Sequence, residues 1–347
     1  MDVLSPIASS AAPIVRKGFS LSVVVPVYDE EAVLPEFHRR LGAVLDTVSP
    51  RVEIIYVNDG SRDACSALLA KLNAEDPRVC VIELSRNFGK EIAMTAGLDH
   101  AEGDAVIVID SDLQDPPELI ADMVRAWQDG TDVVLMRRAS RAQESWFKKA
   151  TASAFYHVIG RLSDIDIPDN VGDFRLLSRR AVVAFRKLPE RSRFMKGLFA
   201  WIGYPSRELL YDRDGRFAGE TKWNYWQLWN FALEGITSFS AAPLKIASYV
   251  GFVTALVAFS YGVFVIAKTL LYGDAVRGYP SLVVLVLFLG GLQLMALGII
   301  GEYIARMFVE VKRRPLYLIE QRRAPSRPIA AAGAESPAAH PEPWRSR

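Results

Sequence analysis

The stretch DSDLQDPPE, residues 110–118, brings three aspartates and a glutamate together. It directly follows an apolar run, AVIVI, so these carboxylates lie at the end of a predicted buried strand. Carboxylates this close repel one another unless a cation lies among them. Asp110 and Asp112, with a neutral oxygen from Gln114, can bind one hard divalent cation such as Mg²⁺ or Mn²⁺. Because such ions commonly bind through one or two carboxylates plus substrate phosphates, the pattern predicts a nucleotide diphosphate or a similar ligand.

The second half of the stretch has a structural explanation. Asp115 as N-cap, Pro116 at the first helical position and Glu118 at the third would begin the next helix. This explanation leaves Asp110 and Asp112 unaccounted for, and we assign those two residues to the cation. A calcium-binding EF-hand is excluded because Asp115 stands where that loop requires glycine.

The elements that must position these residues are predicted from hydrophobic patterning. Short β-branched runs alternate with helical patterns from residue 21 to about 138, which predicts an α/β domain with a parallel sheet covered on both faces. The predicted strands are 21–28, 52–57, 79–84, 105–110 and 132–136, with a further strand at 171–178. Ligands of such sheets bind at the carboxyl ends of the strands. Polar clusters follow four of them: YDEE (28–31), NDGS (58–61), SRNFGK (85–90) and DSDLQD (110–115).

Several other kinds of site are excluded by the sequence. No P-loop motif of the form GxxxxGKS or GxxxxGKT is present, and PVYDEE stands where a dinucleotide-binding protein would carry GxGxxG. The four histidines are scattered and the two cysteines form no CxxC pattern, which argues against a zinc site. The net charge of +1 gives no overall bias toward polyanions, so we expect no nucleic-acid partner.

Two long apolar stretches lie near the C-terminus, at 246–267 and 281–301. Each is near the ~20 residues that span a bilayer and neither carries a charge, so together they predict a two-helix transmembrane hairpin. Arg306 and the basic run 312–314 follow the second stretch, and the positive-inside rule therefore places both termini and the α/β domain in the cytoplasm. The tryptophan-rich segment 223–240 predicts an amphipathic helix in the membrane interface.

These segments divide the chain into five parts. They are a disordered N-terminus (1–19), a catalytic domain (20–222), an interfacial helix (223–244), a transmembrane hairpin (245–305) and a basic cytoplasmic tail (306–347), disordered from about residue 323. The N-terminus contains an early aspartate and two prolines and lacks an uninterrupted apolar core, so we do not expect a signal peptide.

Several motifs, taken together and in order, resemble a known enzyme family. PVYDEE, NDGS, SRNFGK and DSDLQDP resemble the family-2 glycosyltransferases with a GT-A fold. The later motifs are similar to those of bacterial polyprenyl-phosphate glycosyltransferases, relatives of dolichol-phosphate mannose synthase and of the bactoprenol-phosphate glucosyltransferases: VGDFRLLSRRAV (171–182), AGETKW (218–223), GITSFSAAPL (235–244) and GEYIARMFVEVKRRP (301–315). The chain departs from the family pattern at Asn58, where aspartate is commoner, and at Lys90, where a smaller or neutral residue is frequent.

The resemblance covers roughly residues 20 to 320 and implies a fold and a function. The implied fold is a GT-A domain with a Rossmann-like mixed sheet, followed by interfacial helices and the hairpin. The implied reaction transfers a sugar, with inversion, from a nucleotide-sugar to polyprenyl phosphate at the cytoplasmic face of the inner membrane. Related enzymes use UDP-glucose, UDP-N-acetylglucosamine, UDP-galacturonate, UDP-4-amino-arabinose derivatives or GDP-mannose. We favour UDP-glucose, because bacterial two-span relatives lean toward UDP donors. Relatives commonly assemble as tetramers, so a homo-oligomer is expected.

The resemblance also assigns roles to single residues. The nucleotide-binding residues it implies are Pro26, Tyr28, Glu30, Asp59 and Asp110. Asp110, Asp112 and Gln114 are implied to hold Mg²⁺ or Mn²⁺ under the diphosphate.

The acceptor phosphate is already an anion, so the enzyme needs cations to hold it more than it needs a strong base. Arg138 ends the fifth predicted strand, and Lys149 and Ser153 lie one turn apart on the next predicted helix. These three residues are the predicted lipid-phosphate ligands, and Asp112 and Arg138 are the predicted catalytic residues. Possible further contacts from later loops are Arg175, Arg193, Arg216 and Lys222.

Two alternative functions would use the same fold. A processive polysaccharide synthase would need more membrane spans and a QxxRW-type acceptor motif, and the sequence shows neither. A non-catalytic membrane scaffold would bind the nucleotide-sugar or the lipid without turnover. The intact Asp110-x-Asp112 pair, Gln114 and Arg138 argue against a scaffold.

Overall fold

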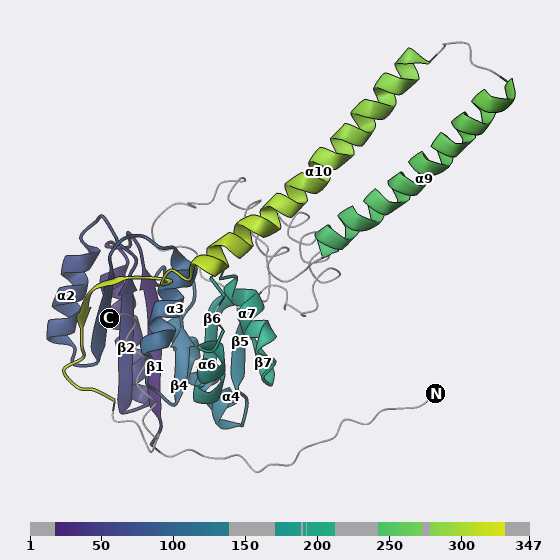
Figure 1. Cartoon of the computed structure of the whole chain (residues 1–347). Coiled ribbons are helices and arrows are strands. Elements are labelled where there is room, and N and C mark those ends of the chain that lie inside the picture. The colour runs from purple at the N-terminus through teal and green to yellow at the C-terminus, as the bar shows by residue number, and fades with distance from the viewer. Residues whose placement is uncertain are drawn as a thin grey trace, which may run out of the picture.

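The computed structural model of the chain describes residues 18–138, 171–188, 190–191, 193–211, 242–272 and 278–329. Its centre is an eight-stranded sheet with the strand order β7-β5-β6-β4-β1-β2-β3-β8 (Figure 1). The strands are β1 (Ser20–Val27), β2 (Arg51–Asn58), β3 (Val79–Leu84), β4 (Ala105–Val108), β5 (Val133–Arg138), β6 (Val171–Ser178), β7 (Ser206–Tyr211) and β8 (Ile319–Arg323). β6 and β8 run antiparallel to their neighbours, so the sheet is mixed.

Helices cover both faces of the sheet. They are α1 (Leu34–Val48), α2 (Cys65–Glu75), α3 (Lys90–His100), the short 3₁₀ helix η1 (Pro117–Leu119), α4 (Ile120–Gln128), α6 (Arg179–Phe185) and α7 (Met195–Trp201). One core layer contains Phe37 of α1, Leu69 of α2 and Trp127 of α4. The other contains Met94 of α3 and Leu198 of α7. All eight residues of β1 are buried because both of its faces are covered, which explains its continuous apolar character.

The strands predicted from the sequence are confirmed to within two residues, but β7 and β8 were not predicted. Both carry charged side chains, in SRELLY and IEQRR, and most of their side chains are exposed. Edge strands commonly carry charged side chains, which protect the free edge, so no apolar pattern marks them. The strands predicted between residues 21 and about 138, β1 to β5, all run in the same direction, as predicted. The antiparallel strands β6 and β8 come from later in the chain, and the mixed sheet implied by the family resemblance is confirmed.

Two long helices, α9 (Ala242–Tyr272) and α10 (Tyr279–Lys312), lie side by side and project away from the sheet (Figure 1). Within the described residues, Phe288–Lys312 is long and apolar enough to cross a membrane, and Ile246–Tyr261 forms a shorter apolar helical stretch. The prediction of two membrane spans therefore stays a prediction. The predicted interfacial helix (223–240) lies outside the described residues.

The C-terminal segment returns to the sheet after α10. Arg313 at the helix end has a left-handed backbone conformation, φ 46°, which turns the chain. The backbone N–H of Ser85 donates to Leu318, and β8 then pairs with β3. The prediction that the α/β domain ends at residue 222 is wrong for this reason. The segment 324–329, predicted to be disordered, also contacts the domain, through a hydrogen bond from the Arg327 N–H to the Pro77 carbonyl.

Candidate active site

The polar clusters after β1 and β2 meet at one edge of the sheet. The backbone N–H of Asp29 donates to Ser61 Oγ at 3.1 Å, and the N–H of Arg62 donates to Asp29 Oδ1 at 2.8 Å. The fourth cluster joins them because Ser111 Oγ donates to the carbonyl of Pro26 at 3.3 Å. Parallel strands bring their carboxyl ends to the same edge, and the predicted grouping of the clusters is confirmed.

Asp59, predicted to bind the nucleotide, organises the third cluster. Its carboxylate is buried and accepts the backbone N–H groups of Phe88 and Gly89 at 2.7 and 2.9 Å. Burial raises the pKa of Asp59 against the effect of these two donors. Gly60 permits the approach, because it has φ 66° and a Cβ there would lie 2.5 Å from the backbone of Arg86. Asp59 thereby fixes the loop that begins α3.

The remaining predicted nucleotide residues lie around the end of β1. Pro26 is within β1, and Tyr28 follows it. The carbonyl of Glu30 accepts the N–H of Leu34 at 3.0 Å, and the N–H of Glu30 donates to Cys65 Sγ at 3.3 Å. Glu30 therefore anchors the start of α1 through its backbone.

The residues predicted to hold a metal form a compact turn. Asp112 Oδ1 accepts the N–H of Gln114 at 3.1 Å, and Leu113 between them has φ 59°. Asp110 Oδ1 and Gln114 Oε1 are buried and have no hydrogen-bond partner among the described residues. Buried oxygens of this kind are costly unless a ligand satisfies them, so these residues fit a divalent cation. In the described parts of the chain no three His, Cys, Asp or Glu side chains form a metal cluster, so such a cation would also depend on substrate oxygens.

Lys90 connects this turn to β6. Its Nζ donates to Asp110 Oδ2 at 2.7 Å and to Asp173 Oδ2 at 2.5 Å. β4 and β6 are antiparallel with Val108 opposite Arg175, and continuing this register by two residues sets Asp110 opposite Asp173. Asp173 and the contact of Lys90 were not predicted. In the sequence, Asp173 belongs to the motif VGDFRLLS and Lys90 to the motif SRNFGK. Neither motif reveals that β6 lies beside β4, which is what brings Asp173 next to Asp110 and Lys90.

The charges of this cluster shift one another's pKa values. Burial and the neighbouring aspartates raise the pKa of Asp110 to about 6, although Lys90 opposes the change. For Asp173 burial acts in the same direction, but Lys90, Lys196 and Arg175 outweigh it and lower the pKa. The two carboxylates outweigh the effect of burial on Lys90 and raise the pKa of its ammonium, so Lys90 is charged at neutral pH.

Asp115 does not cap a helix, contrary to the prediction. It is buried, and Tyr211 at the end of β7 donates a hydrogen bond to Asp115 Oδ1 at 2.5 Å. The residue before η1 is Pro116, and no side chain caps that helix. Glu118 instead pairs with Arg40 of α1 through two hydrogen bonds at 3.0 and 2.8 Å. The long-range partner of Asp115 was invisible in the sequence because β7 itself was not predicted.

Arg138, a predicted catalytic and acceptor residue, ends β5 close to Asp115. Burial and the Asp115 carboxylate raise the pKa of Tyr211, while a hydrogen bond from Arg138 lowers it. Arg138 Nε is buried and has no partner among the described residues. A partly buried guanidinium with a free N–H beside the acidic turn can bind an anion.

The remaining predicted contacts are distributed differently. Arg175 lies on β6, where its guanidinium donates to the Gly172 carbonyl at 2.8 Å and stacks 4.1 Å above the ring of Phe199. It is buried behind Asp173 and does not lie in a loop. Arg193 is also buried and donates to the Leu188 carbonyl at 3.0 Å. The structure does not describe Lys149, Ser153, Arg216 or Lys222.

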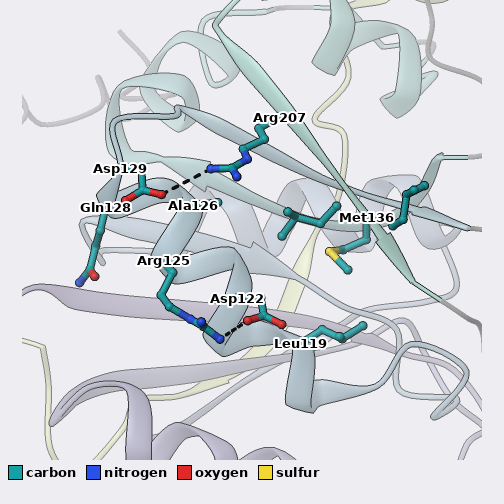
Figure 2. A pocket seen from close by; sticks show the side chains of 10 residues that line it. Leu119, Asp122, Arg125, Ala126, Gln128, Asp129, Met136 and Arg207 are labelled. Carbon is teal, nitrogen blue, oxygen red and sulfur yellow. Dashed lines mark hydrogen bonds and ion pairs between the residues drawn. The ribbon is translucent and has the colours of Figure 1, made fainter. Parts of the chain in front are cut away.

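A hollow of about 440 Å³ lies elsewhere on the sheet, between α4 and β7. Figure 2 shows that ion pairs cross and border it, including Arg207 to Asp129 at 3.4 Å. None of its lining residues belongs to the four strand-end clusters. The volume of this hollow therefore does not mark the edge of the sheet where the four clusters meet.

Comparison with known proteins gives two family matches and many close relatives. Residues 22–185 match the model of glycosyl transferase family 2, and residues 242–307 match the GtrB C-terminal hairpin. An uncharacterised glycosyltransferase of Synechocystis is 54% identical over 86% of this chain and 94% of its own. A prophage bactoprenol glucosyl transferase homologue of Escherichia coli is 48% identical over 87% of this chain and 98% of its own.

Relatives from phages and a solved structure extend the comparison. The bactoprenol glucosyl transferase of Shigella phage SfV is 47% identical over 87% of this chain and 99% of its own. A solved fragment of S. aureus TarS is 19% identical over 62% of this chain and 66% of its own, with a TM-score of 0.43.

Proposed function

This chain belongs to glycosyl transferase family 2, and we propose that it transfers glucose from UDP-glucose to a polyprenyl phosphate. The relatives named bactoprenol glucosyl transferase support the acceptor and the sugar, because their similarity extends over nearly their whole length. The match to the GtrB C-terminal hairpin supports an enzyme that works beside a membrane. The scaffold alternative has no support from these relatives, whose names describe transferases.

The observation that carries the proposal is the turn formed by Asp110, Asp112 and Gln114. Two of its oxygens are buried without partners among the described residues, at the edge where four strand-end clusters meet. Such a turn would hold Mg²⁺ or Mn²⁺ together with the diphosphate of the donor. The metal would neutralise charge on the departing nucleoside diphosphate.

The reaction needs the two anionic substrates to meet. An oxygen of the lipid phosphate attacks the anomeric carbon, the bond from that carbon to the diphosphate breaks, and UDP leaves, so the configuration inverts. The acceptor oxygen already carries negative charge, and no proton has to be removed from it. We assign the acceptor phosphate to Arg138, whose free Nε supports this role, and to Lys149 and Ser153.

The nucleotide is assigned to the edge of the sheet where the first and second clusters meet. Pro26, Tyr28 and Glu30 would border it, with Asp59 shaping the loop behind. Asp112 is assigned to catalysis through the metal.

The proposed setting is the inner membrane. The catalytic domain and both termini would lie in the cytoplasm, with α9 and α10 as the two spans. The composition of Phe288–Lys312 supports one span directly. Assembly into a homo-oligomer is part of the same proposal.

A donor panel tests the function. Full-length protein in detergent, incubated with a polyprenyl phosphate and labelled UDP-glucose, should give a chloroform-soluble labelled product. Asp112→Ala should lower this rate by about 100-fold or more, because the leaving group loses its stabilisation. Asp122→Ala is the matched control, since Asp122 is an exposed carboxylate on α4 outside the acidic turn. The proposal is wrong if no nucleotide-sugar yields a lipid product or if Asp112→Ala keeps full activity.

A further inference from the structure

One carboxylate of the acidic turn binds an ammonium with one oxygen and leaves the other for the proposed metal. Asp110 Oδ2 accepts a hydrogen bond from the ammonium of Lys90 at 2.7 Å. Asp110 Oδ1 is buried, has no partner among the described residues and is assigned to the metal. The same ammonium is held from the other side by Asp173 at 2.5 Å. Lys90 therefore already neutralises part of the negative charge of the carboxylate that a divalent ion would use.

The position of Lys90 is set by the fold. It is the first residue of α3, after Gly89 with φ 99°, and the N–H groups of Phe88 and Gly89 are held by Asp59. The backbone before Lys90 is thus held in place, and this positions its ammonium beside Asp110 and Asp173. The side chain is still 43% exposed, so the ammonium can leave toward solvent or toward an arriving anion.

We propose that Lys90 is an internal cation that holds Asp110 while the donor is absent, so that the divalent ion binds tightly only together with the nucleotide diphosphate. This inference rests on the proposed function and adds a regulation of the same site. Lys90 is a positioning residue in this scheme, because it acts on the metal through Asp110.

Electrostatics supports this order of events. A divalent ion at Asp110 Oδ1 would lie close to the ammonium on Oδ2, and the two cations repel each other in a partly buried site. Among the described residues no cluster of three carboxylate, imidazole or thiolate ligands compensates for that repulsion. A diphosphate would do so, because its negative charges attract both cations. Metal and nucleotide would then increase each other's affinity by the same factor.

The test measures Mn²⁺ binding to full-length protein in detergent, by the electron paramagnetic resonance signal of free Mn²⁺, with and without UDP. In the wild type UDP should raise the Mn²⁺ affinity strongly. In Lys90→Met the affinity without UDP should rise by about tenfold, and the effect of UDP should shrink by the same factor. Lys196→Met is the matched control, because Lys196 acts on Asp173 and Glu91 but is not a partner of Asp110. Its Mn²⁺ affinity should stay within about twofold of the wild type.

The outcomes separate this inference from a purely structural role of Lys90. If Lys90 only ties β4 to β6, Lys90→Met will melt at a lower temperature with unchanged or weaker Mn²⁺ binding, and the inference is overturned. An equal gain in Lys196→Met, or Mn²⁺ binding by neither protein, also overturns it. Lys90→Gln replaces Lys90→Met if the latter does not fold. Since the assay involves no sugar transfer, an inactive enzyme with the expected Mn²⁺ shift would refute the proposed function alone.

Discussion

Glu91, directly after Lys90, shows how the fold changes the chemistry of one side chain. Burial and the nearby Asp173 raise the pKa of Glu91 to about 8, against the effects of Lys90 and Lys196. Glu91 Oε2 also accepts the N–H of Met195 at 3.3 Å, which links α3 to α7. A carboxyl that is protonated near neutral pH can stay beside Asp173 without adding a second negative charge.

The raised pKa of Glu91 predicts a pH dependence of stability. Between the ordinary pKa of about 4.5 and the folded value of about 8, the folded state binds the proton of Glu91 and the unfolded state does not. The free energy of unfolding therefore decreases as the pH rises through this range. Glu91→Gln should remove this decrease. The melting temperature of the variant relative to that of the wild type should therefore increase from pH 5 to pH 8. Glu75→Gln, at an exposed position at the end of α2, controls for the removal of a surface carboxylate. A constant difference between Glu91→Gln and wild type across this range would contradict the assignment.

At the scale of elements, β8 ties the end of α10 to the catalytic domain. Leu318 accepts the N–H of Ser85, Tyr317 donates to Asp99 at 3.0 Å, and Asn73 donates to the Ala324 carbonyl at 3.2 Å. β8 also covers the edge of β3, which would otherwise expose unpaired N–H and C=O groups. The domain is therefore attached to the C-terminal end of α10 by these contacts.

Removal of β8 should destabilise the catalytic domain. A chain ending at Leu316 should melt about 4 °C lower or more, a shift that corresponds to roughly 1–2 kcal/mol for a domain of this size. Amide exchange in β3 should also become faster, because Ile82 and its neighbours lose their strand partner. A chain ending at Ile329 is the control and should melt like the full chain. Equal melting of the two truncated chains would show that β8 does not stabilise the sheet.

At the scale of the whole molecule, the α/β domain and the helical pair are distinct in composition. The side chains of α10 that point outward include Leu294 and Met295, which are 71% and 61% exposed. Exposed apolar side chains repeated among the described residues of a long helix indicate that a lipid phase or another protein surface covers them. A bilayer satisfies this requirement for both helices at once.

The two-span topology predicts the side of the membrane on which each exposed residue lies. In intact cells Gly278→Cys, between the helices, should react with a membrane-impermeant maleimide added outside. Ser326→Cys, beyond β8, should react only after the inner membrane is permeabilised. Background labelling should be small because Cys65 and Cys80 are buried. Reaction of Ser326→Cys in intact cells, or no reaction of Gly278→Cys, would reject the predicted topology.

The sequence by itself determined the features that depend on local pattern. The strand runs, the apolar helices and the grouping of polar residues after parallel strands all follow from periodicity and from the position of each residue within its own element. Asp110, Asp112 and Gln114 were found in this way, since five consecutive residues at one strand end contain them.

The tertiary structure alone decided which distant residues complete the site. Asp173 meets Lys90 because β6 lies antiparallel beside β4, and Tyr211 meets Asp115 because β7 joins the sheet through β5. The pairing of β8 with β3 could not be predicted from the sequence either. The physical reason is that strand pairing depends on backbone hydrogen bonds, which almost any sequence can form, so the neighbour of even a predicted strand such as β6 is not written in its side chains. The edge strands β7 and β8 also carry charged, mostly exposed side chains and lack an alternating apolar pattern.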